Sequence, residues 1–311
     1  MICAYCGKEA RGTKEHIISS GVLDLFPECF ATIDGVRNKV YESDPMVKDV
    51  CADCNNHRIS YIDSYAKTII EKYFLQKYER DSVLSFEYDY VLLQKMLVKY
   101  AFNDSRSRKY DLSFFDRSVI DWLLNEGDSN PKSNITLMAG LAVNTSPAPD
   151  FVFGNNKLRW GKSPLLLSNS IVMNLDYETG KITVRDHFEP ESFKKLALSY
   201  LFRFNSLQVI MMCWEPTISA EDLKSNTVVL GVQYPYEILN QSGKSQLKRC
   251  TSETTYHLEN LIDVSWGQGL MDEISYMRGT FSEKSQKYFK EVEQAWKKEE
   301  EKLAQEHPSV T

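Results

Sequence analysis

The chain has 311 residues, which is enough for one large domain or two domains of ordinary size. Hydrophobic residues make up 42% of the sequence and charged residues 26%, a balance that excludes a mostly disordered chain, a collagen-like repeat and a coiled-coil rod. The net charge of −6 argues against a protein that coats nucleic acid through bulk charge alone. Any chemistry on nucleic acid would therefore need a local site, a metal ion or a basic partner.

The beginning of the sequence and its apolar runs bear on the cellular compartment. Residues 1–4 open a segment that has neither the basic part nor the apolar part of a secretory signal. The longest apolar run, around Val209–Trp214, has the length of a strand and is well short of the roughly 18–20 residues that cross a bilayer. We therefore expect a cytoplasmic protein in a reducing environment, with no membrane partner.

The first 80 residues are predicted to form one unit, because polar residues near positions 78–85 indicate a domain edge there. Short strands are expected over Lys14–Ser19 and Val47–Cys51, with a loop over residues 20–46 between them. A helix is expected to begin near Cys54. Its predicted buried face has apolar residues at helical spacing: Ile59, Ile62, Ala66, Ile69, Ile70, Tyr73 and Phe74.

The remaining residues, 81–311, are predicted to form a larger domain of mixed helix and antiparallel sheet, whose role the sequence does not indicate. A helical part over 86–125 contains helices at 90–102 and 113–125, with a basic loop over 104–109 between them. A β-rich part over 134–235 follows, interrupted by a helix around 192–204. Its expected strands are 135–143, 165–175, 181–184, 206–213 and 228–233. A charged helix over 282–305 ends the chain, so the overall class is α+β.

Two Cys-x-x-Cys pairs, Cys3/Cys6 and Cys51/Cys54, lie within the first unit. Because two residues between thiols let both sulfur atoms point at one centre, two such pairs predict a closed tetrahedral shell around a structural Zn²⁺ ion. A redox-active pair is the alternative, but that interpretation expects one pair in a thioredoxin-like setting. The other cysteines have no spaced partners and are predicted to be buried or inert thiols: Cys29, Cys213 and Cys250.

Chemically useful side chains lie beside the cysteine pairs. Glu15 and His16 are on the first expected strand, and Asn55 and Asn56 directly follow Cys54 at the start of the helix. A folded zinc unit would bring these groups together, with the imidazole facing the first helical turn. Neutral imidazole can take a proton from water at physiological pH, and amide or carboxylate oxygens suit a hard divalent cation. A helix N-terminus also favours an anionic phosphate, so the pattern predicts phosphodiester hydrolysis.

These motifs resemble the HNH endonuclease superfamily, in particular the subgroup with Cys-Asn-Asn after the second cysteine pair. The resemblance covers about residues 1–75. Its elements occur in the order Cys3-x-x-Cys6, Glu15-His16-Ile17-Ile18 and Val50-Cys51-x-x-Cys54-Asn55-Asn56. The resemblance implies a treble-clef, ββα-metal fold for the N-terminal unit, followed by the larger α+β domain.

The resemblance also implies roles for single residues. His16 would be the general base, Asn55 a ligand of a catalytic Mg²⁺ or Mn²⁺ ion, and Glu15 a further ligand, while the cysteines would hold only the structural zinc. A residue that holds the base-bearing segment in place is also expected, and Asp44 and Asp49 are both candidates. Each assignment has a structural alternative: a capping histidine, a helix-capping asparagine and an ordinary salt-bridged glutamate.

The implied activity is hydrolysis of nucleic-acid phosphodiester bonds, with DNA preferred over RNA. Such proteins often belong to prokaryotic antiviral defence or mobile-element systems, so residues 81–311 are expected to bind a protein partner. Candidate contacts to nucleic acid are Lys14, Arg58, Arg106 and Arg108. One alternative function is a catalytically inactive, zinc-stabilised module that docks nucleic acid or protein. A second places the main activity in residues 81–311, where no recognisable catalytic motif occurs.

Overall fold

The computed structural model of the chain describes residues 1–26, 32–34, 39–41, 43–76, 78–79, 81–141, 165–168, 173–175, 182–184, 193–233 and 236–250, with the single residues 294 and 301. Within these ranges no helix is both long enough and apolar enough to span a membrane. The charged helix predicted over 282–305 lies outside the described residues, apart from those two single positions.

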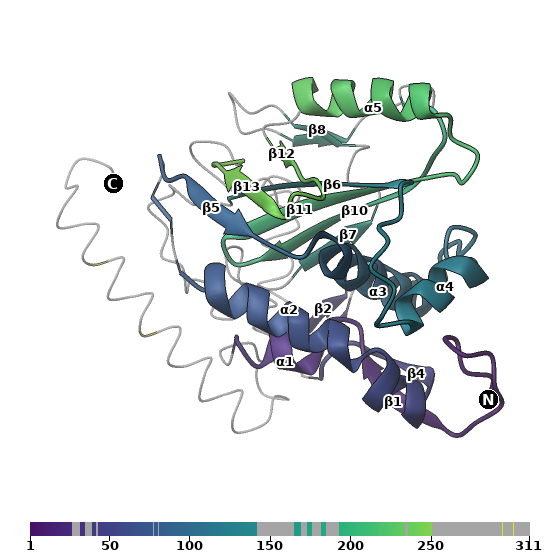
Figure 1. The fold of residues 1–311 in the computed structure, drawn as a ribbon. Helices are drawn as coiled ribbons and strands as arrows, with labels where there is room; N and C mark the ends of the chain where they lie inside the picture. Colours follow the sequence, from purple (N-terminus) through teal and green to yellow (C-terminus); the bar gives the residue numbers. More distant parts are fainter. Residues whose placement is uncertain are drawn as a thin grey trace.

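The N-terminal unit is a hairpin followed by a helix (Figure 1). Strand β1 (Gly12–His16) pairs antiparallel with β4 (Met46–Cys51). A π-helical turn, η1 (Cys54–Arg58), then leads into helix α2 (Ser60–Tyr73). These elements confirm the two strands and the amphipathic helix that the sequence predicts, although β1 begins two residues before the predicted start at Lys14 and ends three residues before the predicted end at Ser19.

The segment between β1 and β4 is more structured than the predicted loop over 20–46. It contains the short helix α1 (Ser20–Leu23) and a small hairpin of β2 (Thr32–Asp34) and β3 (Lys39–Tyr41). Val22 of α1 is fully buried in the main hydrophobic core, and its packing holds α1 against the rest of the unit.

Helix α3 (Tyr90–Arg108) is longer than the helix predicted over 90–102. The Asp89 side chain caps its first turn by accepting the backbone N–H of Leu92 at 2.8 Å. The helix ends at Lys109, which has the left-handed φ of 59°. The predicted basic loop over 104–109 is therefore wrong, because its polar residues form the last turns of a helix that is buried over much of its length.

The described residues that follow α4 (Arg117–Leu124) include a five-stranded antiparallel sheet with the strand order β12-β6-β11-β10-β7. Its strands are β6 (Ile135–Leu141), β7 (Leu165–Ser168), β10 (Leu196–Phe204), β11 (Leu207–Trp214) and β12 (Glu237–Ile238). The predicted mixed α+β class with antiparallel sheet is confirmed.

Shorter elements surround the sheet. Strand β5 (Leu84–Glu87) pairs with β13 (Lys244–Leu247), and β8 (Met173–Leu175) pairs with β9 (Ile182–Val184). Helix α4 (Arg117–Leu124) lies within the predicted helix over 113–125.

Two predicted elements have the opposite type. The helix expected around 192–204 is strand β10, which turns at Asn205, with φ of 51°, to pair with β11. The strand expected over 228–233 is the end of helix α5 (Ala220–Gln233). The Ser219 hydroxyl accepts the backbone N–H of Asp222 at 3.0 Å and so caps α5, which makes the apolar run that follows helical.

The sheet separates two hydrophobic clusters. Residues of β11 alternate between them: Val209 and Met211 face the cluster shared with α3, whereas Ile210 and Met212 face the cluster that includes Leu230 of α5. Figure 1 shows α5 on one side of the sheet, with α3 and then the N-terminal unit on the other. Helix α3 is therefore the layer between the sheet and the hairpin.

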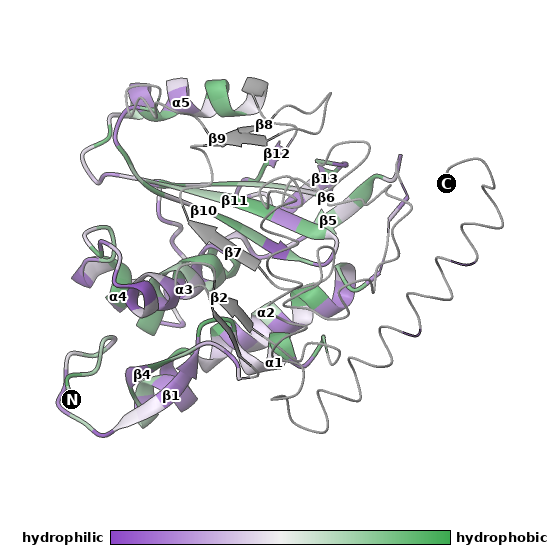
Figure 2. Ribbon diagram, turned by 180° about the vertical axis from the view of Figure 1, so that it is seen from behind, coloured by the Kyte–Doolittle hydropathy of each residue, from purple (hydrophilic) through white to green (hydrophobic). Residues whose placement is uncertain are grey.

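The larger cluster crosses the predicted boundary at residue 80. It contains Tyr5 and Ile62 of the N-terminal unit, Leu97 of α3 and Phe204 of the sheet. Figure 2 shows hydrophilic residues on α3 beside hydrophobic ones, although most of this helix is buried. The division into domains 1–80 and 81–311 stays a prediction. Because the N-terminal unit packs on α3, the test is whether residues 1–80 fold without this helix.

We predict that the isolated segment 1–80 does not fold with zinc, because α2 would expose the buried Ile62, Ile69 and Ile70 side chains. A segment extended to the end of α4 at Leu124 should regain part of the native contacts. The measurement is a ¹H–¹⁵N NMR spectrum of each zinc-loaded segment. A well-dispersed spectrum from residues 1–80 would show that the boundary at residue 80 is an independent folding boundary.

Candidate metal centre and its surroundings

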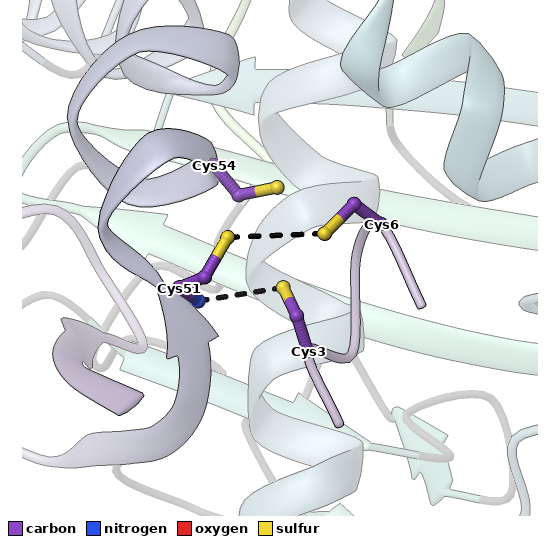
Figure 3. Close-up of side chains that lie close together, drawn as sticks. All are labelled: Cys3, Cys6, Cys51 and Cys54. Carbon is purple, nitrogen blue, oxygen red and sulfur yellow. Dashed lines mark hydrogen bonds between the residues drawn. The ribbon is translucent and has the colours of Figure 1, made fainter. Parts of the chain in front are cut away.

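Four cysteine side chains converge at the junction of the N-terminal turn, strand β4 and η1 (Figure 3). Their sulfur atoms all lie within 4.8 Å of one another: Cys3, Cys6, Cys51 and Cys54. The Cys6 and Cys51 Sγ atoms are 3.8 Å apart, and all four thiols are free. Tetrahedral Zn–S bonds of about 2.3 Å place sulfur atoms about 3.8 Å apart, so the donor set fits Zn²⁺. The predicted gathering of the two cysteine pairs is confirmed.

Backbone contacts hold the first cysteine pair against the second. Gly7 closes the turn by donating its N–H to the Cys3 carbonyl at 2.9 Å, and its φ of 71° is one that glycine adopts without strain. Ala4 donates to the Asp49 carbonyl at 2.8 Å, and Cys51 N–H donates to Cys3 Sγ at 3.3 Å. These hydrogen bonds close the turn that carries Cys3 and Cys6 and hold it next to Cys51.

The thiols differ in how readily they ionise. Burial opposes ionisation of Cys3, but backbone N–H groups, the first that of Cys6, favour its thiolate and lower its pKa to about 7. Burial raises the pKa of Cys51 and of Cys54. A bound cation would favour the thiolate form of all of them.

His16 is the last residue of β1, with 29% of its side chain exposed. Its Nε2 atom lies 3.7 Å from Oδ2 of Asp44, one of the two aspartates considered for holding this segment. The other, Asp49, forms an ion pair with Arg106 at 3.3 Å. The main-chain carbonyl of His16 accepts a 3.0 Å hydrogen bond from Asn103 on α3.

The Asn55 side chain lies against the strand that carries His16. Its amide nitrogen donates to Oγ1 of Thr13 at 3.0 Å and to the carbonyl of Lys14 at 3.1 Å. The β1–β4 register shifts between Thr13 and Glu15, an irregularity of the kind that re-aims strand side chains. Both amide hydrogens are thereby used, which leaves the carbonyl oxygen of Asn55 as the atom able to bind a cation.

Glu15 lies in a buried ion-pair network. Its Oε1 atom is 2.8 Å from Nζ of the fully buried Lys99, which also lies 2.5 Å from Oδ1 of Asp63. Burial raises the pKa of Asp63, although the charge of Lys99 opposes this. The Glu15 carboxylate therefore faces α3, a contact that local sequence patterns do not indicate because Lys99 is 84 positions away along the chain.

The four candidate nucleic-acid contacts differ in exposure. Lys14 is exposed and Arg58 half-buried. The Arg106 side chain is only 6% exposed and its guanidinium lies 4.2 Å from the centre of the Phe102 ring, while Arg108 pairs with Asp104 at 2.8 Å. Arg106 therefore belongs to the interior rather than to an exposed basic loop.

The other cysteines that the structure describes lie away from the cluster. Cys213 and Cys250 are buried, as predicted, and burial raises the pKa of each thiol. Cys29 lies outside the described residues.

Among the residues that the structure describes, the four cysteines are the one group of His, Cys, Asp and Glu side chains close enough to hold a metal ion. Comparison of the chain with protein-family models, with curated proteins and with solved structures finds no match. Any assignment of function therefore rests on the residues of the N-terminal unit themselves.

We predict that Cys51→Ala abolishes zinc binding, because three thiolates cannot close the tetrahedral shell. The free energy of unfolding should fall by about 4 kcal/mol or more, as expected for loss of a structural metal. Zinc content by atomic absorption and unfolding by urea are the measurements. Cys213→Ala, a buried thiol away from the cluster, is the matched control and should keep its zinc. Equal zinc content in the two variants would contradict the assignment.

We predict that Lys99→Met destabilises the protein by about 3–5 kcal/mol at neutral pH, because Glu15 and Asp63 lose their buried cationic partner. The pKa of Asp63 is already raised in the native state, and removing Lys99 raises it further. A carboxyl with a raised native pKa favours the folded state when protonated, so the deficit should be smaller at pH 5 than at pH 7.5.

Urea unfolding at pH 7.5 and pH 5 measures this difference. Lys95→Met is the matched control: Lys95 lies on the same helix and bonds the Asn125 carbonyl at 2.7 Å rather than a carboxylate. A deficit for Lys99→Met that is equal at both pH values would contradict the ion-pair account.

Proposed function

We propose that this chain is a metal-dependent endonuclease of the HNH type, with a treble-clef, ββα-metal unit at its N-terminus and DNA preferred over RNA. The observation that carries the proposal is the order of parts around the cysteine cluster: a turn with two thiols, a hairpin whose first strand ends in His16, and a helix that begins at Cys54 and carries Asn55. This order agrees with the motif resemblance.

In the proposed reaction, the imidazole of His16 takes a proton from a water molecule as that water attacks phosphorus. The partial exposure of the ring leaves it reachable by solvent and substrate. The carbonyl oxygen of Asn55 would hold Mg²⁺ or Mn²⁺, and such an ion, when bound, stabilises charge on the phosphate and on the leaving oxygen. The cysteines suit zinc and Asn55 suits a harder cation, so the two metals would not compete.

The Glu15 carboxylate is left out of the proposed ligand set, because it is buried and its Oε1 atom contacts Lys99 and Asn103 of α3. Lys14 and Arg58 are the remaining basic candidates on the hairpin and on η1 for contact with phosphates. Residues 81–311 would recognise a protein partner or a target, in keeping with the defence and mobile-element systems that the resemblance implies.

A second candidate is a catalytically inactive module that binds nucleic acid or protein. The observation that favours it is the buried ion pair of Glu15 with Lys99. Without Glu15, the proposed catalytic cation has fewer protein oxygens than the sequence suggests. Binding without cleavage would separate this module from the nuclease.

We predict that the wild-type chain, loaded with zinc and given Mn²⁺ or Mg²⁺, nicks supercoiled plasmid DNA, and that His16→Ala lowers the rate by about 10²–10⁴-fold because the general base is lost. The matched control is His57→Ala, since His57 is an exposed histidine on η1. It should cut at close to the wild-type rate. Full activity of His16→Ala would overturn the assignment of the base, and a wild-type chain that binds DNA without cutting it would favour the docking module.

A further inference from the structure

Asn103 of α3 lies outside the segment that carries the nuclease motifs, yet it is fully buried against that segment. Its amide nitrogen donates to the main-chain carbonyl of His16 at 3.0 Å and to Oε1 of Glu15 at 3.4 Å. Its oxygen accepts from the hydroxyl of Tyr5 at 2.8 Å and from Nη2 of Arg106 at 2.6 Å. Both donors and the acceptor of this amide are therefore in use.

The partners of Asn103 fix the direction in which its amide points. A guanidinium can only donate hydrogen bonds, so the Asn103 side-chain oxygen must face Arg106. The amide nitrogen then faces the His16 carbonyl and the Glu15 carboxylate of β1. The Arg106 guanidinium is itself held over the rings of Tyr5 and Phe102, at 5.2 Å and 4.2 Å from their centres. This arrangement leaves one orientation for the amide.

Tyr5 connects this amide to the cysteine cluster. It lies between Cys3 and Cys6 in the sequence, its side chain is fully buried, and its ring packs edge-on against Phe102 of α3 at 5.3 Å. The chain of contacts therefore runs from the cysteine turn through the Tyr5 hydroxyl and the Asn103 amide to the main chain of His16.

The His16 ring has weaker constraints of its own. It is partly exposed, and among the described residues the ionic partner of its side chain is Asp44, which lies at 3.7 Å, beyond the range of a good hydrogen bond. The direction of the ring therefore depends on the position of the peptide that follows it. That peptide is held by Asn103 at its carbonyl and by the Ile17 N–H, which donates to the Pro45 carbonyl at 3.0 Å.

We propose that Asn103 is a positioning residue that couples the cysteine turn, through Tyr5, to the main chain that aims the His16 imidazole. The effect of Asn103 on the cutting rate rests on the proposed function. Its effect on the position of His16 does not. A reacting group misplaced by about 1 Å can lose about 10²-fold in rate, which sets the size of the expected effect.

The test compares Asn103→Leu with Gln94→Leu in the full-length, zinc-loaded protein. Gln94 is an equally buried amide on the same helix, and it bonds the main chain at Lys132 and Ile135 instead of the N-terminal unit. Both variants replace a buried amide by a side chain of similar size, so they should lose comparable stability. They differ in whether the lost hydrogen bonds reach His16.

The first measurement is the ¹³Cε1–¹H NMR signal of His16, assigned by its disappearance in His16→Gln. In Asn103→Leu this signal should shift and broaden, with zinc content unchanged, whereas in Gln94→Leu it should keep its wild-type position. The second measurement is the plasmid-nicking rate, which should fall about 10²-fold in Asn103→Leu and change less than about twofold in Gln94→Leu. A His16 signal that is the same in both variants would overturn the proposal.

Asn103→Asp covers the case in which the leucine variant does not fold. The aspartate keeps an oxygen for Tyr5 and Arg106 but brings a second oxygen to the His16 carbonyl, so the His16 signal should again move, and an unmoved signal would again overturn the proposal. A wild-type chain that cuts no nucleic acid would refute the proposed nuclease, while the NMR comparison would still decide the role of Asn103. If His16→Ala stops cutting but Asn103→Leu cuts at the wild-type rate, the proposed nuclease is supported and the positioning role of Asn103 is refuted.

Discussion

The meeting of four thiols at one point is the constraint on which the N-terminal structure depends. Cys3 and Cys6 lie in a turn before the hairpin, and Cys51 and Cys54 lie where β4 ends and the helix begins, so one ion would tie both ends of the hairpin together. A two-stranded hairpin is at best marginally stable by itself in water. The cluster and the packing on α3 together fix the position of this hairpin. Because His16 is the last residue of β1, the position of its imidazole depends on that of the strand.

Helix α3 supplies the second half of the constraint. Lys99, Asn103 and Arg106 recur along one face at helical spacing, and each makes a polar contact with the N-terminal unit. Buried polar groups are costly unless they are paired, and the docking of the unit gives each of the three a polar partner. On its other side the same helix meets the sheet, where Ser105 and Tyr200 lie 2.8 Å apart at their hydroxyls. A helix outside the motif segment thus sets the orientation of the residues proposed to react.

Local patterns in the sequence predicted the parts of this arrangement that are themselves local. The cysteine spacing predicted the cluster, and the apolar periodicity after Cys54 predicted α2, because in both cases the relevant neighbours lie a few residues apart. The contact of Asn103 with Glu15 joins residues 88 positions apart, and the polar composition of 104–109 suggested a solvated loop. Strand β10 and the end of α5 were assigned the wrong type because a short apolar run fits a buried strand and a buried helix equally well. The Ser219 cap would have distinguished the helix.

We propose that the four cysteines bind one zinc ion and thereby fold the unit that presents His16 and Asn55. The most direct test is X-ray absorption at the zinc edge of the purified full-length protein. We expect one zinc ion per chain with four sulfur neighbours at about 2.3 Å and no nitrogen or oxygen neighbour in the inner shell. A metal-free protein with disulfide-linked cysteines, or zinc bound by a mixture of sulfur with nitrogen or oxygen, would contradict it.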